Sequence, residues 1–144
     1  TAAGRDPAAL DLTVAVGVEL TDDVEEAGRR HAEGYAFTFG AMGSPTRNFY
    51  NDAFTRQGYG EDVREVQRLW LAGERDAARR RVPTAIGLGT NLVGTEDMVR
   101  DRLRLYRDAG VTTLRAGLAG DGLDAQLGQL GRLLDLVSAV NAET

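Results

Sequence analysis

The chain contains no cysteine and no lysine, and it has one histidine and only two serines, Ser44 and Ser138. Without cysteine, disulfides and thiolate metal sites are excluded, and a single histidine does not supply the ligand set of a zinc site. Without lysine, neither a P-loop lysine nor a Schiff-base lysine is present. Neither serine lies in a Gly-x-Ser-x-Gly pattern, so the nucleophile elbow of the hydrolases is also absent.

Acidic residues outnumber basic ones, 22 to 17. The net charge is −5 and the isoelectric point is about 4.9, whereas proteins that neutralise phosphates are more usually basic. No apolar run is long enough to cross a bilayer and no signal peptide opens the chain. We expect a cytoplasmic protein with neither nucleic acid nor membrane as a partner. Because the chain opens at Thr1 rather than at methionine, we expect processing or a longer parent polypeptide.

Two segments have the pattern of β-strands. Residues 11–20 alternate strictly, with Leu12, Val14, Val16, Val18 and Leu20 on one side. Residues 111–118 form the second predicted strand. Helices are predicted after the N-cap residues Thr21 and Thr95, over 61–81 with a break at Gly73, and over the final leucine stripe. That stripe is interpreted as core packing and consists of Leu123, Leu127, Leu130, Leu134 and Val137. Residues 84–93 are expected to be irregular or to include one short strand.

The order of these elements favours an α/β fold with parallel strands. Two strands alone are too few, because parallel strands need neighbours at their edges and cover on both faces. We therefore expect the chain to be part of a larger α/β fold, or to receive its missing strands from another polypeptide.

Aromatic residues are also unevenly placed. Seven of the nine lie between Tyr35 and Tyr59, in a window that glycines and a proline interrupt. Large rings beside flexible glycines suit a wall for a flat apolar ligand. Aromatic clusters are, however, more often part of a core than of a pocket. The spacing therefore favours a segment that inserts its rings into the core over a binding site.

The motif Phe39-Gly40-Ala41-Met42-Gly43-Ser44, followed by Arg47-Asn48-Phe49-Tyr50-Asn51-Asp52 and Gly58-Tyr59, resembles a stretch of the luciferase-like monooxygenase superfamily. The resemblance is strongest to its deazaflavin-dependent oxidoreductase branch. Later pieces match in the same order, among them Leu92-Val93-Gly94-Thr95 and Asp108-Ala109-Gly110-Val111-Thr112-Thr113-Leu114. The similarity runs from about residue 11 to 118. Relatives often have Gly-Gly in place of Gly40-Ala41 and lysine in place of Arg47.

The resemblance implies a fold. The family adopts a (β/α)8 TIM barrel, which takes about 250 residues, so 144 residues cannot complete one. Residues 1–144 would be the C-terminal portion of one barrel domain, with 11–20 and 111–118 as its last two strands. Residues 35–83 would be a helical, aromatic insertion between them. The missing N-terminal barrel portion or a partner fragment would complete the fold, and a homo-oligomer is expected.

The resemblance also implies a function. We expect an oxidoreductase that transfers hydride between reduced coenzyme F-420, a deazaflavin, and a small organic substrate. The alternatives are an FMN-dependent monooxygenase and a non-catalytic flavin-binding relative. No catalytic residue is named and no metal is expected. The candidate cofactor- or substrate-binding residues are Glu19, Met42, Arg47, Asn48, Phe49, Tyr50 and Arg115.

Each candidate has an expected role. Glu19 and Arg115 would face the barrel axis, where Arg115 either pairs with Glu19 or anchors an anionic group of cofactor or substrate. Over the barrel mouth, Asn48 would supply hydrogen bonds and Arg47 would face a charged tail. Three apolar side chains would either form a lid on the ligand or lock the loop to the barrel; these are Met42, Phe49 and Tyr50.

Overall fold

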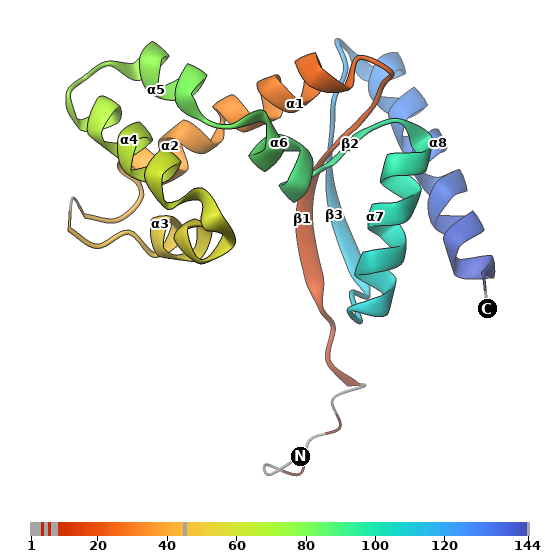
Figure 1. Cartoon of the computed structure of the whole chain (residues 1–144). Coiled ribbons are helices and arrows are strands. Elements are labelled where there is room, and N and C mark those ends of the chain that lie inside the picture. Colours follow the sequence, from red (N-terminus) through yellow and green to blue (C-terminus); the bar gives the residue numbers. More distant parts are fainter. Residues whose placement is uncertain (1–3, 5, 7–8, 45, 144) are drawn as a thin grey trace. The chain divides into compact units, whose positions relative to one another are not determined.

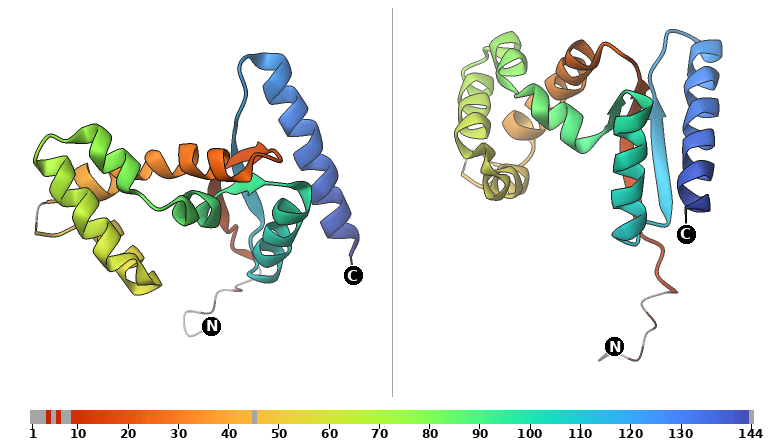
Figure 2. Two further views of the ribbon diagram at one scale, coloured as in Figure 1. Left: turned by 45° about the horizontal axis from the view of Figure 1, so that its top comes forward. Right: turned by 45° about the vertical axis from the view of Figure 1, so that its right-hand side comes forward.

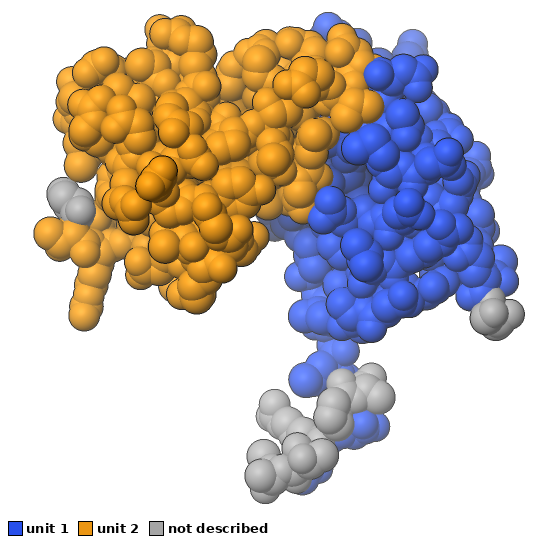
Figure 3. Space-filling model, in the orientation of Figure 1, with its two compact units in different colours: residues 1–22, 91–144 blue, residues 23–90 orange. Residues whose placement is uncertain are grey.

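The computed structural model describes residues 4, 6, 9–44 and 46–143. The chain divides into two compact units, which Figure 3 distinguishes by colour. Unit 1 comprises Thr1–Asp22 and Asn91–Thr144, and unit 2 comprises Asp23–Thr90. Each is described by itself.

Unit 1 is built on a parallel sheet of three strands in the order β2-β1-β3 (Figure 1). The strands are β1 Thr13–Leu20, β2 Leu92–Gly94 and β3 Thr113–Leu118. Both predicted strands are confirmed, and they pair directly with each other from Thr13 opposite Thr113 to Val18 opposite Leu118. The short strand β2 lies at the end of the glycine-rich segment 84–93, for which a short strand was one of the expectations. It pairs with the other edge of β1, from Val18 opposite Leu92 to Leu20 opposite Gly94.

Two helices pack on the apolar side of β1 and lie alongside the strands (Figure 2). They are α7 Glu96–Asp108 and α8 Leu123–Ala142. The period-two pattern of β1 is confirmed, because Val16, Val18 and Leu20 are buried and their odd-numbered neighbours are not. Their partners in the core are Leu92, Val99, Leu103, Leu133, Leu136 and Val140. Fully burying one such side chain stabilises a fold by about 1.5–3 kcal/mol.

The leucine stripe predicted to pack into the core is only partly buried, so that prediction was wrong for most of its members. Leu123, Leu127 and Leu134 are 69%, 52% and 58% exposed. The side of α8 that faces the sheet instead carries Leu133, Leu136 and Val140. The helix is apolar on more than one side, so helical periodicity alone did not single out the face that meets β1.

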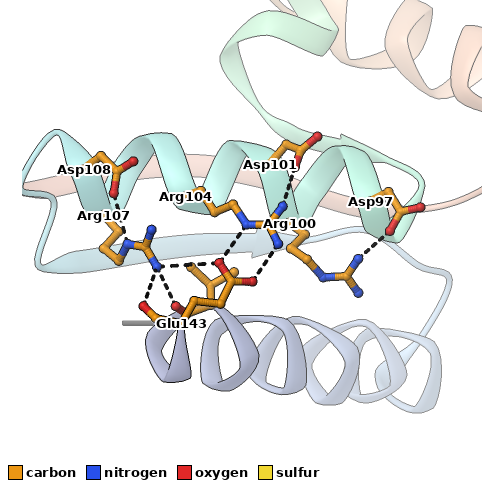
Figure 4. Close-up of polar contacts among 8 residues, drawn as sticks. Asp97, Arg100, Asp101, Arg104, Arg107, Asp108 and Glu143 are labelled. Atoms are coloured by element: carbon orange, nitrogen blue, oxygen red, sulfur yellow. Dashed lines mark hydrogen bonds and ion pairs between the residues drawn. The ribbon is translucent and has the colours of Figure 1, made fainter.

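A cluster of charged residues ties the end of α8 to α7 (Figure 4). The Glu143 carboxylate accepts from Nε and Nη2 of Arg104 at 2.8 and 2.6 Å. Arg107 Nη1 donates to the carbonyl of Val140 at 2.7 Å, and Asp101 adds a second carboxylate to Arg104 at 2.7 Å. These contacts raise the pKa of Arg104 and lower the pKa of Glu143 from its ordinary value of 4.5, in both cases chiefly through their mutual hydrogen bonds.

Unit 2 is helical in the part that the structure describes. Its helices are α1 Val24–Glu33, α2 Tyr35–Ala41, α3 Phe49–Phe54, α4 Gly60–Leu71, α5 Arg75–Arg81 and α6 Thr84–Thr90, with a π-helical turn, η2, over Thr55–Tyr59. The predicted break at Gly73 is confirmed, because its φ of +85° ends α4. The core contains Ala32, Ala36, Phe39, Val63, Val66, Leu69, Ala78, Val82 and Ile86.

Helix α6 occupies the segment that was expected to be irregular, and that expectation was wrong. The glycines that suggested irregularity instead allow two helices to approach closely. A Cβ at Gly87 would lie 2.1 Å from the carbonyl oxygen of Gly28 in α1, and one at Gly28 would lie 2.7 Å from Leu88 Cγ. Tertiary packing of α1 against α6 therefore outweighs the low helix propensity of glycine.

This crossing generates a prediction with a control on the same helix. Gly87→Ala is expected to lower the free energy of unfolding by about 1–3 kcal/mol or more, because the new Cβ would meet backbone that must move. Gly89→Ala should be neutral or stabilising by up to about 1 kcal/mol, since nothing lies within 4 Å of its Cβ position. Urea unfolding of both variants checks this. Equal stabilities would contradict the close crossing.

The Glu143 cluster generates a prediction about pH. Because its pKa is lowered in the folded state, the carboxylate contributes stability above 4.5, and that contribution is lost as the pH falls through the lowered pKa. Glu143→Gln should therefore lower the melting temperature at pH 7 and low salt, with a difference that shrinks toward pH 3 and in high salt. Asp97→Asn, which removes one exposed partner of Arg100, is the matched control and should change the melting temperature less. A pH-independent difference would exclude the ionic contribution.

Candidate functional site

One face of the sheet in unit 1 carries small and polar side chains. Gly17 lies opposite Gly117 in the register, and Ala15 lies opposite Arg115. A hollow of about 310 Å³ follows this face and is lined by Ala15, Val16, Arg115, Ala116 and Gly117. Paired glycines leave the surface without Cβ atoms, so a flat ligand can approach the backbone closely. The only charged side chain that lines the hollow is the exposed guanidinium of Arg115.

The register bears on the expected pairing of Glu19 with Arg115. Arg115 lies opposite Ala15, while Glu19 lies opposite Val93 on the other edge of β1. Four residues of strand separate Ala15 from Glu19, which is about 13 Å at ~3.3 Å per residue. An ion pair would need both side chains to extend along the strand, so it stays a prediction. The geometry favours the other expected role, an anchor for an anionic group.

In unit 2, a loop between α2 and α3 is held by two buried asparagines. The amide of Asn48 donates from Nδ2 to the carbonyls of Thr38 and Phe39, at 3.2 and 2.9 Å. Its Oδ1 accepts from the backbone N–H groups of Tyr50 and Asn51, which caps α3. Asn51 Nδ2 donates to the same Phe39 carbonyl at 3.1 Å. Asn48 therefore has a structural role, and its amide is already fully engaged.

A polar cavity of about 240 Å³ lies beside this loop. It brings together two of the predicted residues, Arg47 and Asn48. The remaining lining residues are Thr46, Asn51, Asp52, Thr55, Arg64 and Gln67. Sequence reasoning missed Arg64 and Gln67, which are three residues apart on α4 and so share one side of that helix. The sequence pattern did not indicate that this side of α4 meets the loop after α2.

The aromatic window divides between the two interpretations offered for it. Tyr35, Phe39, Phe54 and Tyr59 pack in or against the core, with the rings of Phe39 and Phe54 in edge contact at 4.9 Å. In contrast, Met42, Phe49 and Tyr50 are 38%, 72% and 39% exposed. The rings of Phe49 and Tyr50 contact each other at 5.8 Å. Both expected roles, a lid on the ligand and a lock of the loop to the barrel, therefore stay predictions.

The described residues offer neither a metal site nor a membrane-spanning helix. Among the described residues, no group of three or more His, Asp or Glu side chains is placed to hold a metal ion. No helix in the same part of the chain combines the length and the apolar character needed to cross a membrane.

Comparison with known proteins identifies the class. The model of the luciferase-like monooxygenase family matches residues 1–113, so the chain belongs to this family of oxidoreductases and monooxygenases. The resemblance read from the sequence is thereby confirmed.

A particular relative is found in Mycobacterium tuberculosis (strain ATCC 25618 / H37Rv). It carries the provisional name of a coenzyme F420-dependent oxidoreductase and is 30% identical over 105 residues, which cover 73% of this chain. The chain spans 30% of the length of that relative. No solved structure gives a significant match.

The asparagine network generates a stability prediction. Asn48→Ala should lower the free energy of unfolding by about 1–3 kcal/mol, because it removes the cap of α3 and leaves the Thr38 carbonyl without its donor. Thr46→Ala, in the same loop but exposed, is the control and should change stability by less than about 0.5 kcal/mol. Denaturant unfolding of the two variants provides the measurement. An Asn48 variant as stable as wild type would show that the amide does not hold the loop.

Proposed function

We propose that the protein is a coenzyme F-420-dependent oxidoreductase that transfers hydride between the reduced coenzyme and a small organic substrate. The observation that carries this proposal is the luciferase-like family match over residues 1–113, joined by the 30% identity to a relative named for coenzyme F420. Because the chain spans only 30% of that relative, the activity belongs to the full polypeptide or assembly that contains it.

The surface of unit 1 fits part of such a coenzyme. A hollow of about 310 Å³ is at the lower end of the ~300–1,000 Å³ typical of cofactor sites. Its lining of small residues, Gly117 among them, suits a flat ring, and the Arg115 guanidinium suits a phosphate or carboxylate. We propose Arg115 as the anchor, and Met42, Phe49 and Tyr50 as apolar contacts with ring or substrate.

The chemistry divides between coenzyme and protein. When bound, a deazaflavin supplies the hydride-transfer chemistry. The chain's own residues bind and orient: Arg115 holds an anionic group, and the Gly17–Gly117 surface lets a ring lie against the sheet. Arg47 is proposed to meet a charged tail. Glu19 is kept as a candidate contact near the end of β1.

We also propose that the sheet is the C-terminal part of a (β/α)8 barrel whose remaining strands lie outside this chain. Two observations support it. Unit 1 covers only the apolar side of β1 with α7 and α8, as on the outer side of a barrel. The exposed leucines of α8 further suggest a missing neighbour. The direct pairing of β1 with β3 is the one expected of the last two barrel strands, whereas β2 occupies the other edge of β1, where the preceding barrel strand would pair.

A second candidate is an FMN-dependent monooxygenase, which the family's own description favours. Oxygen consumption distinguishes the two. A monooxygenase with reduced FMN consumes oxygen together with substrate, whereas the F-420 reaction changes the coenzyme's absorbance without oxygen.

The proposed function generates a binding prediction for the full polypeptide. Binding of coenzyme F-420 to the wild type should be detectable by fluorescence. Arg115→Met should weaken this binding about tenfold or more. Loss of a charge-assisted hydrogen bond costs about 1.5–3 kcal/mol, and 1.4 kcal/mol is a factor of ten. Arg80→Met, on the exposed end of α5, is the control and should bind as the wild type does.

Two outcomes would count against these assignments separately. Unchanged affinity in the Arg115 variant would remove its anchor role while leaving the function intact. Failure of the wild type to bind F-420, with binding of FMN instead, would replace the proposed function by the monooxygenase.

A further inference from the structure

A cavity that the proposed function does not use lies in unit 1, between α7, α8 and the start of β3. Its volume is about 110 Å³, and its lining residues are Leu103, Tyr106, Arg107, Val111, Thr112, Leu114, Val137, Val140 and Asn141. Leu114 packs toward the helices, whereas its neighbour Arg115 lines the hollow on the other face of the sheet. The cavity is therefore separate from the surface proposed for the coenzyme.

Polar contacts hold the two helices at a fixed spacing beside this cavity (Figure 4). Arg107 Nη1, on α7, donates to the carbonyl oxygens of Val140 and Glu143 at the end of α8, at 2.7 and 3.3 Å. The Glu143 carboxylate accepts two hydrogen bonds from Arg104, one turn earlier on α7. The helices therefore cannot shift to fill the gap without breaking these contacts. The cavity is preformed, as small-molecule sites usually are.

The wall of the cavity is mainly aliphatic. Its aliphatic residues are the buried Leu103 and Val140 and the half-buried Val111, Leu114 and Val137. At the exposed rim, Asn141 presents a side-chain amide that has no hydrogen-bond partner among the described residues. An unpaired amide offers two donors and one acceptor together. An apolar wall with a few polar groups at one end is the usual composition of a small-molecule site.

Charge at the cavity favours an uncharged ligand. Arg107 is the only charged side chain among the lining residues, and it already pairs with Asp108 at 3.1 Å and with Glu143 at 3.7 Å. A third carboxylate, that of Asp11, accepts a hydrogen bond from the hydroxyl of the lining residue Thr112. An anion would be repelled by these carboxylates, and a cation by the guanidinium that lines the cavity.

The volume limits the apolar part of the ligand. An apolar cavity of about 150 Å³ binds benzene. In the same proportion, a cavity of about 110 Å³ accommodates about four carbon atoms. A short branched chain fits this space, whereas the ring system of a flavin does not.

From the wall, the rim and the charges we propose that this cavity binds a small primary amide with a short branched aliphatic chain. The aliphatic chain would lie among Leu103, Leu114 and Val137. The amide would pair with the Asn141 side chain, donating one hydrogen bond to it and accepting one from it. Asn141 thereby becomes a binding residue at the end of α8. The proposal does not depend on the oxidoreductase assignment.

The test uses isobutyramide as the probe and the full polypeptide as the receptor. Binding should shift the methyl resonances of Leu103, Leu114 and Val137 in a saturable way, with a Kd on the order of 1 mM for so small a ligand. Isobutyrate has the same shape but a negative charge, so it should bind about tenfold more weakly. Asn141→Ala should weaken isobutyramide binding about two- to tenfold, the net contribution of one hydrogen bond.

A pair of variants on α8 tests the location of the site. Val137→Phe places a ring in the cavity and should abolish binding, whereas Leu134→Phe places the same ring at an exposed position and should leave the affinity unchanged. Melting curves show whether each variant is folded. Because Asn141 is exposed, Asn141→Ala should keep the wild-type melting temperature and tests the site even where Val137→Phe unfolds.

Three outcomes would overturn the proposal. The first is the absence of a saturable shift up to about 50 mM isobutyramide. The second is an unchanged affinity in Asn141→Ala or in folded Val137→Phe. The third is an affinity for isobutyrate equal to or higher than that for isobutyramide.

Discussion

The alternation of side chains along β1 is the constraint on which unit 1 depends. Its even-numbered residues are buried between the sheet and the two helices α7 and α8, and its odd-numbered residues are left on the opposite face. Because successive side chains of a strand point to opposite faces, a shift of one residue would exchange the two sets. The small, open surface around Gly17 and Gly117 is therefore a direct consequence of burying Val16 and Val18.

Unit 2 depends on hydrogen bonds from two buried asparagines. A single carbonyl, that of Phe39, accepts hydrogen bonds from the amides of both Asn48 and Asn51, and these bonds bring the start of α3 back to the end of α2. The loop between them then lies beside α4, which creates the cavity with Arg64. The same asparagine that anchors the loop leaves one oxygen unsatisfied.

The family was recognised from local motifs. Such motifs can be read reliably from a sequence because their residues are contiguous in the chain. Both strands, the N-cap at Thr95 and the break at Gly73 were predictable from period and turn chemistry. The predicted N-cap at Thr21 was wrong, because the side chain of Asp23 caps α1 instead. The helix at Thr84–Thr90 was not, because the two glycines that favour its close crossing with α1 are 59 residues apart (Gly28 and Gly87). The sheet-facing side of α8 was missed for a related reason: two apolar stripes compete on one helix. For the candidate residues, Arg47 and Asn48 were predicted together, while Arg64 lies 16 residues further along the chain (64 minus 48).

The sequence by itself determined the α/β class, the alternating faces of the strands and the membership in the luciferase-like family, because each of these depends on residues that are neighbours in the chain. Only the tertiary structure decided which rings are core and which are exposed, where Arg115 lies relative to Glu19, and that Arg47, Asn51 and Arg64 surround one cavity. These outcomes depend on contacts between segments far apart in the chain. Local propensity has no information about such contacts, since burial and long-range packing select among the arrangements that it permits.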